Sequence, residues 1–327
     1  MSKELALWNF AAERLRAGRL VMLLVVAESS GSSPGRHGYK MAVAADGELF
    51  GSIGGGVMEM RLVEQARLLL SNPDPQTNPF VVEQVHRKNA ENASGMICSG
   101  RQSVIFQPLT NAELGTIDDI IAALISRHAS YLSISTGGIR MVSQREGSKV
   151  LGEVFHKGPD AVFKYTERLG KKNDLYIVGG GHCSLALSEL MSRMDFNVHI
   201  FDDRPELNTI EKNEFADSIT IVDKYENVGE HIVAGERSYV VVMTVGYASD
   251  EVVIRSLLGK DLRYLGVLGS KAKMAKLLKQ LRDEGPDNNR LDRIHTPIGL
   301  PINSHTPDEI AVSIAAEIIA EKNSAAD

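Results

Sequence analysis

The stretch "LYIVGGGHCSLAL" (residues 175–187) decides the fold of the second half of the chain. Its β-branched, apolar start predicts a buried strand, and the apolar spacing after the glycines predicts a helix. Gly179, Gly180 and Gly181 join the two, and with a serine as the small third residue they fit the pattern G-x-G-x-x-[G/A]. Asp202 ends the next apolar run about 20 residues later, which is typical of a dinucleotide-binding βαβ unit.

A turn of this kind binds phosphate, because the helix start offers free N–H groups and the positive end of the helix dipole. We expect the three glycines and His182 to line this site. We also expect Asp202 or its neighbour Asp203 to accept a hydrogen bond from a ribose 2′-hydroxyl and to repel a 2′-phosphate. Gly269 and Ser270 repeat the strand-to-helix arrangement further along the chain and are further candidates for cofactor binding. The alternative is a Rossmann-like domain that has lost its ligand, since a fold does not fix a function.

The organisation of the chain predicts two domains. From residue 174 onward, strand and helix patterns alternate, which predicts right-handed βαβ units and a parallel sheet. The last helix opens at Thr306 with a capping box and a proline at its first position. The first half has no regular alternation and includes a hairpin with its turn at Asp46. We therefore predict an α/β protein with a mixed α+β domain at 1–165 and a Rossmann-like domain at 172–327.

Composition limits the class of protein. The chain has 327 residues, of which 43% are hydrophobic and 24% charged, and its net charge is −6. An acidic balance argues against a nucleic-acid binder, and no apolar run approaches the roughly 20 residues that span a bilayer. The N-terminus has no signal-peptide core, and two cysteines are too few for a disulfide framework. We expect a soluble, cytoplasmic protein that contacts neither membrane nor nucleic acid.

A second glycine triplet lies in "GSIGGGVME" (residues 51–59). Gly54, Gly55 and Gly56 also follow a strand pattern and precede a helix, so their N–H groups could hold an anion. Glu59, one turn into the helix, faces the same end. No βαβ unit and no strand-end acid surround this triplet, which predicts a different site on a different domain. The alternative is a glycine hinge that serves tight packing alone.

Cys98 is the third candidate, in the segment "SGMICSGRQ" (residues 94–102). It lies between Gly95 and Gly100, in a loop that leads into a strand. A cysteine in such a loop can act as a thiolate metal ligand or handle sulfur. Most free cysteines, by contrast, are small buried side chains, and that interpretation stays open for Cys98.

In these motifs the chain resembles the XdhC/CoxI family, the accessory proteins of xanthine dehydrogenase and related molybdenum hydroxylases. The resemblance covers nearly the whole chain, because several motifs occur in the same order. They are "SSGSSPGRHGYKMAV", "GSIGGGVME", "GMICSG", "LYIVGGGHCSLAL", "VHIFDDRPE", "YLGVLGSKAK", "RIHTPIGLPI" and "TPDEIAVSIAAEIIA".

The resemblance implies an XdhC/CoxI-type N-terminal domain and a C-terminal Rossmann domain. It implies binding of the molybdenum cofactor (molybdopterin), its protection or sulfuration, and its delivery to a xanthine-dehydrogenase-type hydroxylase, with a cysteine desulfurase as candidate sulfur donor. The family often has cysteine where this chain has Val57, so Cys98 is the N-terminal thiol predicted to bind the metal and handle sulfur. We expect no turnover by the protein itself, and a homodimer.

Two other functions fit the same motifs. One is an NAD-dependent oxidoreductase that uses the Rossmann half, with His182 or His295 as acid or base. The other is a regulatory protein that senses NAD or another nucleotide and carries out no chemistry.

Overall fold

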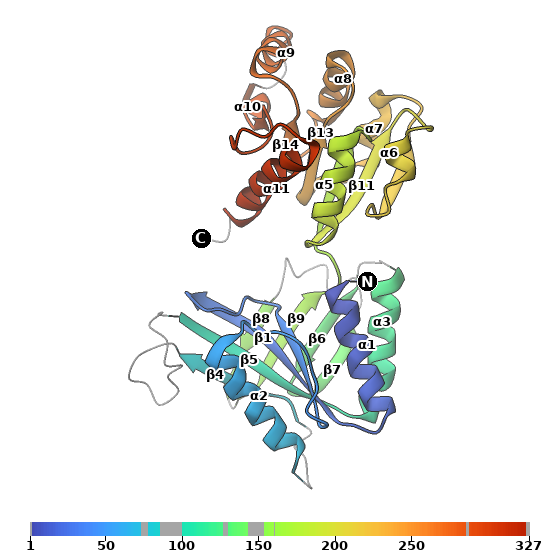
Figure 1. Ribbon diagram of the computed structural model, residues 1–327. Helices are drawn as coiled ribbons and strands as arrows, with labels where there is room; N and C mark the ends of the chain where they lie inside the picture. The colour runs from blue at the N-terminus through green and yellow to red at the C-terminus, as the bar shows by residue number, and fades with distance from the viewer. Residues whose placement is uncertain are drawn as a thin grey trace. The chain divides into compact units, whose positions relative to one another are not determined.

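The computed structural model describes residues 2–72, 78–85, 100–126, 130–142, 154–159, 161–285 and 288–324 (Figure 1). The chain forms two compact units, Met1–Gly170 and Lys171–Asp327. No helix in the described ranges is long and apolar enough to cross a lipid bilayer.

The N-terminal unit is mixed α+β, as predicted, and contains two antiparallel sheets with strand orders β3-β2-β1-β5-β4 and β7-β6-β9-β8. The strands are β1 (Val21–Gly31), β2 (Lys40–Ala44), β3 (Leu49–Gly51), β4 (Phe80–Val85), β5 (Gly100–Leu109), β6 (Tyr131–Ser135), β7 (Gly138–Val142), β8 (Val154–Lys157) and β9 (Phe163–Arg168). The helices are α1 (Lys3–Arg16), α2 (Gly56–Leu70), η1 (Asn111–Glu113) and α3 (Leu114–Ser126).

Strand β1 holds this unit together because both of its faces are buried. Its odd-numbered residues from Val21 to Val25 pack in a core with α1 and α3. Its even-numbered residues from Met22 to Val26 pack in a second core with α2. A central strand covered on both sides has to be apolar at every position, which explains the uninterrupted apolar run at the start of β1.

The C-terminal unit is a Rossmann-type domain, which confirms the predicted fold class. Its six strands are parallel in the order β12-β11-β10-β13-β14-β15. This is the doubly wound order 3-2-1-4-5-6. The strands are β10 (Asn173–Val178), β11 (Phe196–Asp202), β12 (Ser218–Ile221), β13 (Gly235–Val242), β14 (Leu262–Val267) and β15 (Ile294–His295).

Helices cover both faces of this sheet (Figure 1). α5 and α11 pack together in one core, and α8 and α9 pack in the core on the other face. The capping box predicted at Thr306 is confirmed, with Glu309 as its acidic member. The helices are α5 (His182–Ser192), α6 (Asn208–Glu211), η2 (Tyr225–Asn227), α7 (Val228–His231), α8 (Tyr247–Leu257), α9 (Lys271–Asp283), α10 (Asn288–Leu291) and α11 (Pro307–Asn323).

Candidate functional site

The carboxyl ends of β10 and β13 mark the point at which the strand order reverses, because β10 pairs with β11 on one side and with β13 on the other. In open α/β sheets ligands bind in the crevice at such a point. Helices α5 and α8 follow these two strands directly, so both helices begin at this edge. The first predicted glycine turn therefore lies where this fold binds ligands.

The first glycine of the turn closes it against the neighbouring strand. Gly179 has φ +112°, and a Cβ atom there would lie 2.3 Å from the carbonyl oxygen of Met243. A side chain fits neither this conformation nor this space. Gly179 is thus required by the fold itself, whether or not a ligand binds.

The second glycine is held on both sides. The N–H group of Gly180 donates to Asp202 Oδ2 at 2.6 Å, and its carbonyl oxygen accepts a hydrogen bond from Thr209 Oγ1. A Cβ atom on Gly180 would lie 2.7 Å from Ile210 Cδ1 on α6. This glycine faces the protein interior and holds the turn between β10 and α5 against the end of β11 and against α6.

The third glycine faces open space. Gly181 is the N-cap of α5 at φ −73° and ψ −170°, no side chain caps the helix, and no heavy atom lies within 4 Å of an added Cβ. Gly246 is the N-cap of α8 and has the same two properties. The first N–H groups of α5 and α8 therefore have no capping side chain, and both helices present their positive ends at one edge.

The other predicted residues at this edge have local roles. His182 is exposed and begins α5. Ser270 accepts a hydrogen bond from the Lys273 N–H at 3.4 Å and so caps α9 itself. Gly269 leaves room for the side chain of Met274. Ligand binding by His182, Gly269 and Ser270 stays a prediction.

Asp202, predicted to bind a ribose hydroxyl, is enclosed in the protein. Its side chain is 0% exposed. It accepts the Gly180 N–H and three hydrogen bonds from Arg204, one from the backbone N–H at 2.9 Å and two from the guanidinium at 2.8 Å. Burial alone would raise the pKa of Asp202, but the bonds from Arg204 and Gly180 outweigh it and hold that pKa below its usual value. In this structure Asp202 holds the glycine turn, and a ribose hydroxyl would have to displace Arg204.

The glycine triplet of the N-terminal unit has a backbone explanation. Gly54, Gly55 and Gly56 have φ values of +125°, +74° and +71°, where side chains are strained. A Cβ on Gly54 would lie 2.4 Å from the backbone nitrogen of Gly35, and one on Gly35 would lie 2.3 Å from the carbonyl oxygen of Ile53. Two loops thus pack backbone to backbone at Gly54, whereas a Cβ on Gly55 would meet no atom within 4 Å. The positive φ values account for all three glycines without a ligand. Anion binding there stays a prediction.

Glu59 occupies part of the predicted anion site. Its Oε2 atom accepts hydrogen bonds from Ser52 Oγ at 2.7 Å, Ile53 N at 2.8 Å and Gly55 N at 2.9 Å. Burial favours the protonated acid, but these bonds outweigh it, so the pKa of Glu59 lies below its usual value. The carboxylate therefore takes N–H groups that the sequence interpretation assigned to a bound anion.

Cys98 lies outside the described residues, but its neighbourhood is defined from Gly100 onward. A Cβ on Gly100 would lie 2.6 Å from the backbone nitrogen of Ser33, so the start of β5 packs on the serine-rich loop. Buried Ser33 donates to Gln102 at 2.8 Å, and Gln102 donates to Gln84 at 2.9 Å. Among the described residues no group of three His, Cys, Asp or Glu side chains is placed to hold a metal ion.

Sequence reasoning missed a buried charged cluster made of Lys40, Glu4, Glu167 and Tyr165. Lys40 Nζ lies 3.1 Å from Glu4 and 2.9 Å from Glu167, and the Tyr165 hydroxyl donates to Glu167 at 2.9 Å. Burial lowers the pKa of Lys40, but the two carboxylates outweigh it and raise that pKa. The partners lie 36 and 127 positions away in the chain, so no local pattern indicates them.

His295 lies on β15 beside a cavity of about 570 Å³ at the edge of β14. Its Nδ1 atom is 3.7 Å from Glu317, which also accepts hydrogen bonds from the Tyr264 hydroxyl at 2.5 Å and from the Gly299 N–H at 2.9 Å. The cavity is lined by His295, by residues that precede β14 in the chain, and by Arg263. Arg263 forms an ion pair with Glu321. His295 thus has an acidic neighbour, but this cavity is not lined by the glycine turn.

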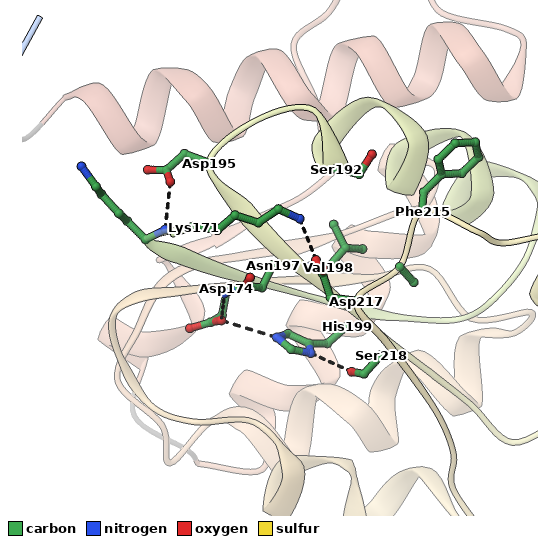
Figure 2. A network of polar contacts seen from close by, with 12 residues as sticks. Lys171, Asp174, Ser192, Asp195, Asn197, Val198, His199, Phe215, Asp217 and Ser218 are labelled. Carbon is green, nitrogen blue, oxygen red and sulfur yellow. Dashed lines mark hydrogen bonds and ion pairs between the residues drawn. The ribbon is translucent and has the colours of Figure 1, made fainter. Parts of the chain in front are cut away.

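A serine, a histidine and an aspartate meet on β12, β11 and β10 (Figure 2). His199 Nδ1 is 2.7 Å from Ser218 Oγ, and His199 Nε2 is 3.4 Å from Asp174 Oδ1. His199 and Ser218 are direct register partners, and Asn197 also donates to Asp174 at 2.9 Å. Cross-strand pairing of neighbouring side chains explains this arrangement as part of the sheet.

The comparisons with known proteins place both units. A family profile described as the XdhC Rossmann domain matches residues 175–318, and one described as the XdhC and CoxI family matches residues 14–81. A crystal structure from Bacillus halodurans, described as a xanthine dehydrogenase, has a TM-score of 0.70 and 24% identity, and the alignment covers 99% of this chain and 96% of that chain. This likeness shows the shared fold.

Two relatives are similar in sequence. YqeB of Escherichia coli K12, described as uncharacterized, is 25% identical over 92% of this chain and 43% of its own length. A Bacillus subtilis 168 protein, described as a probable component of xanthine dehydrogenase, is 30% identical over 47% of this chain and 44% of its own length. The chain thus spans less than half of either relative. Because one family profile matches in each unit, the chain belongs to the XdhC and CoxI family.

Proposed function

We propose that this protein is an accessory protein of a xanthine-dehydrogenase-type molybdenum hydroxylase, and that it binds the molybdenum cofactor and delivers it to that enzyme. The name of the Bacillus subtilis relative supports the kind of partner. One structural observation supports the binding of an anionic ligand: the N-caps of α5 and α8 are glycines that face open space, and no side chain caps either helix.

The chemistry of this edge suits the phosphate-bearing tail of the cofactor. Uncapped N–H groups at two helix starts donate hydrogen bonds to an anion, and the helix dipoles add attraction. Gly181 would lie against the tail, since an added side chain would project into open space rather than into the protein. The thiolate of Cys98 remains our proposed metal ligand and sulfur carrier, with a cysteine desulfurase as sulfur donor. We further propose that the protein acts as a homodimer without turnover of its own.

An NAD-dependent oxidoreductase is the second candidate, and the contact between His295 and Glu317 favours it. A carboxylate beside an imidazole can orient it as an acid or base. Against it, the acid that would hold the NAD ribose is the enclosed Asp202. Measuring bound pterin, molybdenum and NAD together separates the two functions.

The test is cofactor retention by Gly181→Val in full-length protein purified from a host that makes the cofactor. Valine is compatible with the backbone at Gly181 and its Cβ meets no atom within 4 Å, so we expect the fold to persist while the tail site is filled. We expect wild-type protein to carry pterin and molybdenum, and the variant to carry at least about tenfold less of both, the loss of about 1.4 kcal/mol of binding free energy.

Gly259→Val is the matched control, because Gly259 also has no atom within 4 Å of an added Cβ and lies in the turn before β14. It should retain cofactor like the wild type. Equal retention by Gly181→Val, with an unchanged melting temperature, would contradict the proposed site. NAD in place of pterin would favour the oxidoreductase.

A further inference from the structure

Two partly exposed charges remain at the end of β11 once the partners of Asp202 are accounted for. The side chains of Arg204 and Asp203 are 38% and 41% exposed. Asp203 Oδ1 lies 3.7 Å from Arg204 Nε, beyond hydrogen-bond distance. Asp203 also makes a hydrogen bond with buried Tyr225, which restrains it. The ligand edge thus offers one carboxylate and one guanidinium side by side.

The guanidinium is only partly used. Nε and Nη2 of Arg204 each donate to Asp202 at 2.8 Å. A guanidinium has five N–H donors in a planar fork, so about three remain, two on Nη1 and one on Nη2. Because Asp202 neutralises the charge of Arg204, these are directional donors with little net attraction for an anion.

Two common ligand groups fit this pair poorly. A ribose diol on Asp202 would have to displace Arg204, because that carboxylate is enclosed, and a diol on Asp203 would leave the remaining Arg204 donors without a carbonyl acceptor. A phosphate would gain donors from Arg204 but would be repelled by Asp203, which is the uncompensated charge of the three. The pair instead matches a flat group that carries N–H donors and a carbonyl acceptor next to each other.

We propose that Asp203 and Arg204 recognise a 2-amino-4-oxopyrimidine ring, the ring that guanine and the pterins share. Asp203 accepts from the amino group and the adjacent ring N–H, and Arg204 donates to the oxo group. Adenine offers a ring nitrogen acceptor where this ring has its N–H, which would leave Asp203 facing an acceptor. The inference rests on the proposed function only in placing the ligand at this edge.

The test is a specificity swap measured by calorimetry on the full-length protein with GDP, ADP, xanthosine diphosphate and 6-hydroxymethylpterin. Xanthine has an oxo group in place of the 2-amino group, so Asp203→Asn replaces an acceptor by a donor that suits it. We expect wild type to bind GDP or the pterin at least tenfold more tightly than ADP and xanthosine diphosphate. We expect Asp203→Asn to reverse the order of GDP and xanthosine diphosphate by at least tenfold.

Asp283→Asn is the control, an exposed acid in the last turn of α9, and should leave all affinities unchanged. If GDP binds more tightly than the pterin, the ligand is a guanine nucleotide, and if the pterin binds more tightly, it is a pterin. Either result supports the proposal. Equal affinities for GDP and ADP with a weakly bound pterin, no swap in Asp203→Asn, or no binding of any guanine or pterin probe would overturn it. A swap in a protein whose wild type carries neither pterin nor molybdenum would refute the proposed function and leave this inference standing; cofactor loss by Gly181→Val without a swap would do the opposite.

Discussion

Lys40 is a single side chain on which the stability of the N-terminal unit depends. It neutralises Glu4 and Glu167 inside the N-terminal unit. Lys40→Met leaves both carboxylates without their cation, and breaking a buried ion pair in this way costs about 3–5 kcal/mol. We expect urea denaturation to show that loss in the free energy of unfolding of this unit.

Lys276→Met on the exposed face of α9 is the matched control. A surface substitution of this kind changes the free energy of unfolding by about 0.5 kcal/mol or less. A loss below about 1 kcal/mol for Lys40→Met would mean that Glu167 takes up a proton or water without cost, contrary to its enclosed position.

Two glycines in the turn between β10 and α5 have different surroundings, because Gly179 packs against a strand and Gly181 faces open space. Gly179→Ala puts a Cβ against Met243 at a φ of +112°, and such backbone strain alone costs about 1–3 kcal/mol. Gly181→Ala meets no atom, and its gain in chain entropy of about 0.4–1 kcal/mol is offset by the poorer N-cap that alanine makes. The melting temperature should therefore fall for Gly179→Ala and change little for Gly181→Ala. Equal shifts would show that the turn is not built as described.

Sequence patterns predicted the elements well where the elements are regular. The alternation in the Rossmann half and the capping box at Thr306 depend on neighbours within a few residues, so they can be read locally. Strand β9 was missed, because "FKYTER" includes three charged residues, of which Glu167 is buried, and lies between turn-rich segments. Register with β6 and β8 makes it a strand, and that pairing is not local.

The candidate site could be located from sequence but not resolved into roles. Three glycines before a helix indicated the turn, but the sequence does not distinguish their surroundings. Gly179 packs against a strand, Gly180 bonds to Asp202, and Gly181 faces open space. Glu59 was correctly predicted to face the amino end of α2. Its carboxylate accepts the N–H groups of Ile53 and Gly55, and this depends on loop geometry that the sequence does not show. Composition and spacing carry no information on which hydrogen bonds are already made.

The whole molecule combines two units with different chemistry. The C-terminal unit has an edge with uncapped helix starts, and the N-terminal unit has packed glycine and serine loops. In the proposed accessory function the cofactor has to be held and then released to an enzyme, so we propose that the protein delivers it.

Activation of a cofactor-free xanthine-dehydrogenase-type hydroxylase tests this claim most directly. The measurement is hydroxylase activity after mixing the apoenzyme with wild-type protein or Gly181→Val, each purified from the cofactor-producing host. We predict that the wild type restores activity in proportion to its bound molybdenum, and that the variant restores at least about tenfold less. Activation by the variant equal to that by the wild type, or none by a wild-type protein that carries pterin and molybdenum, would contradict the account.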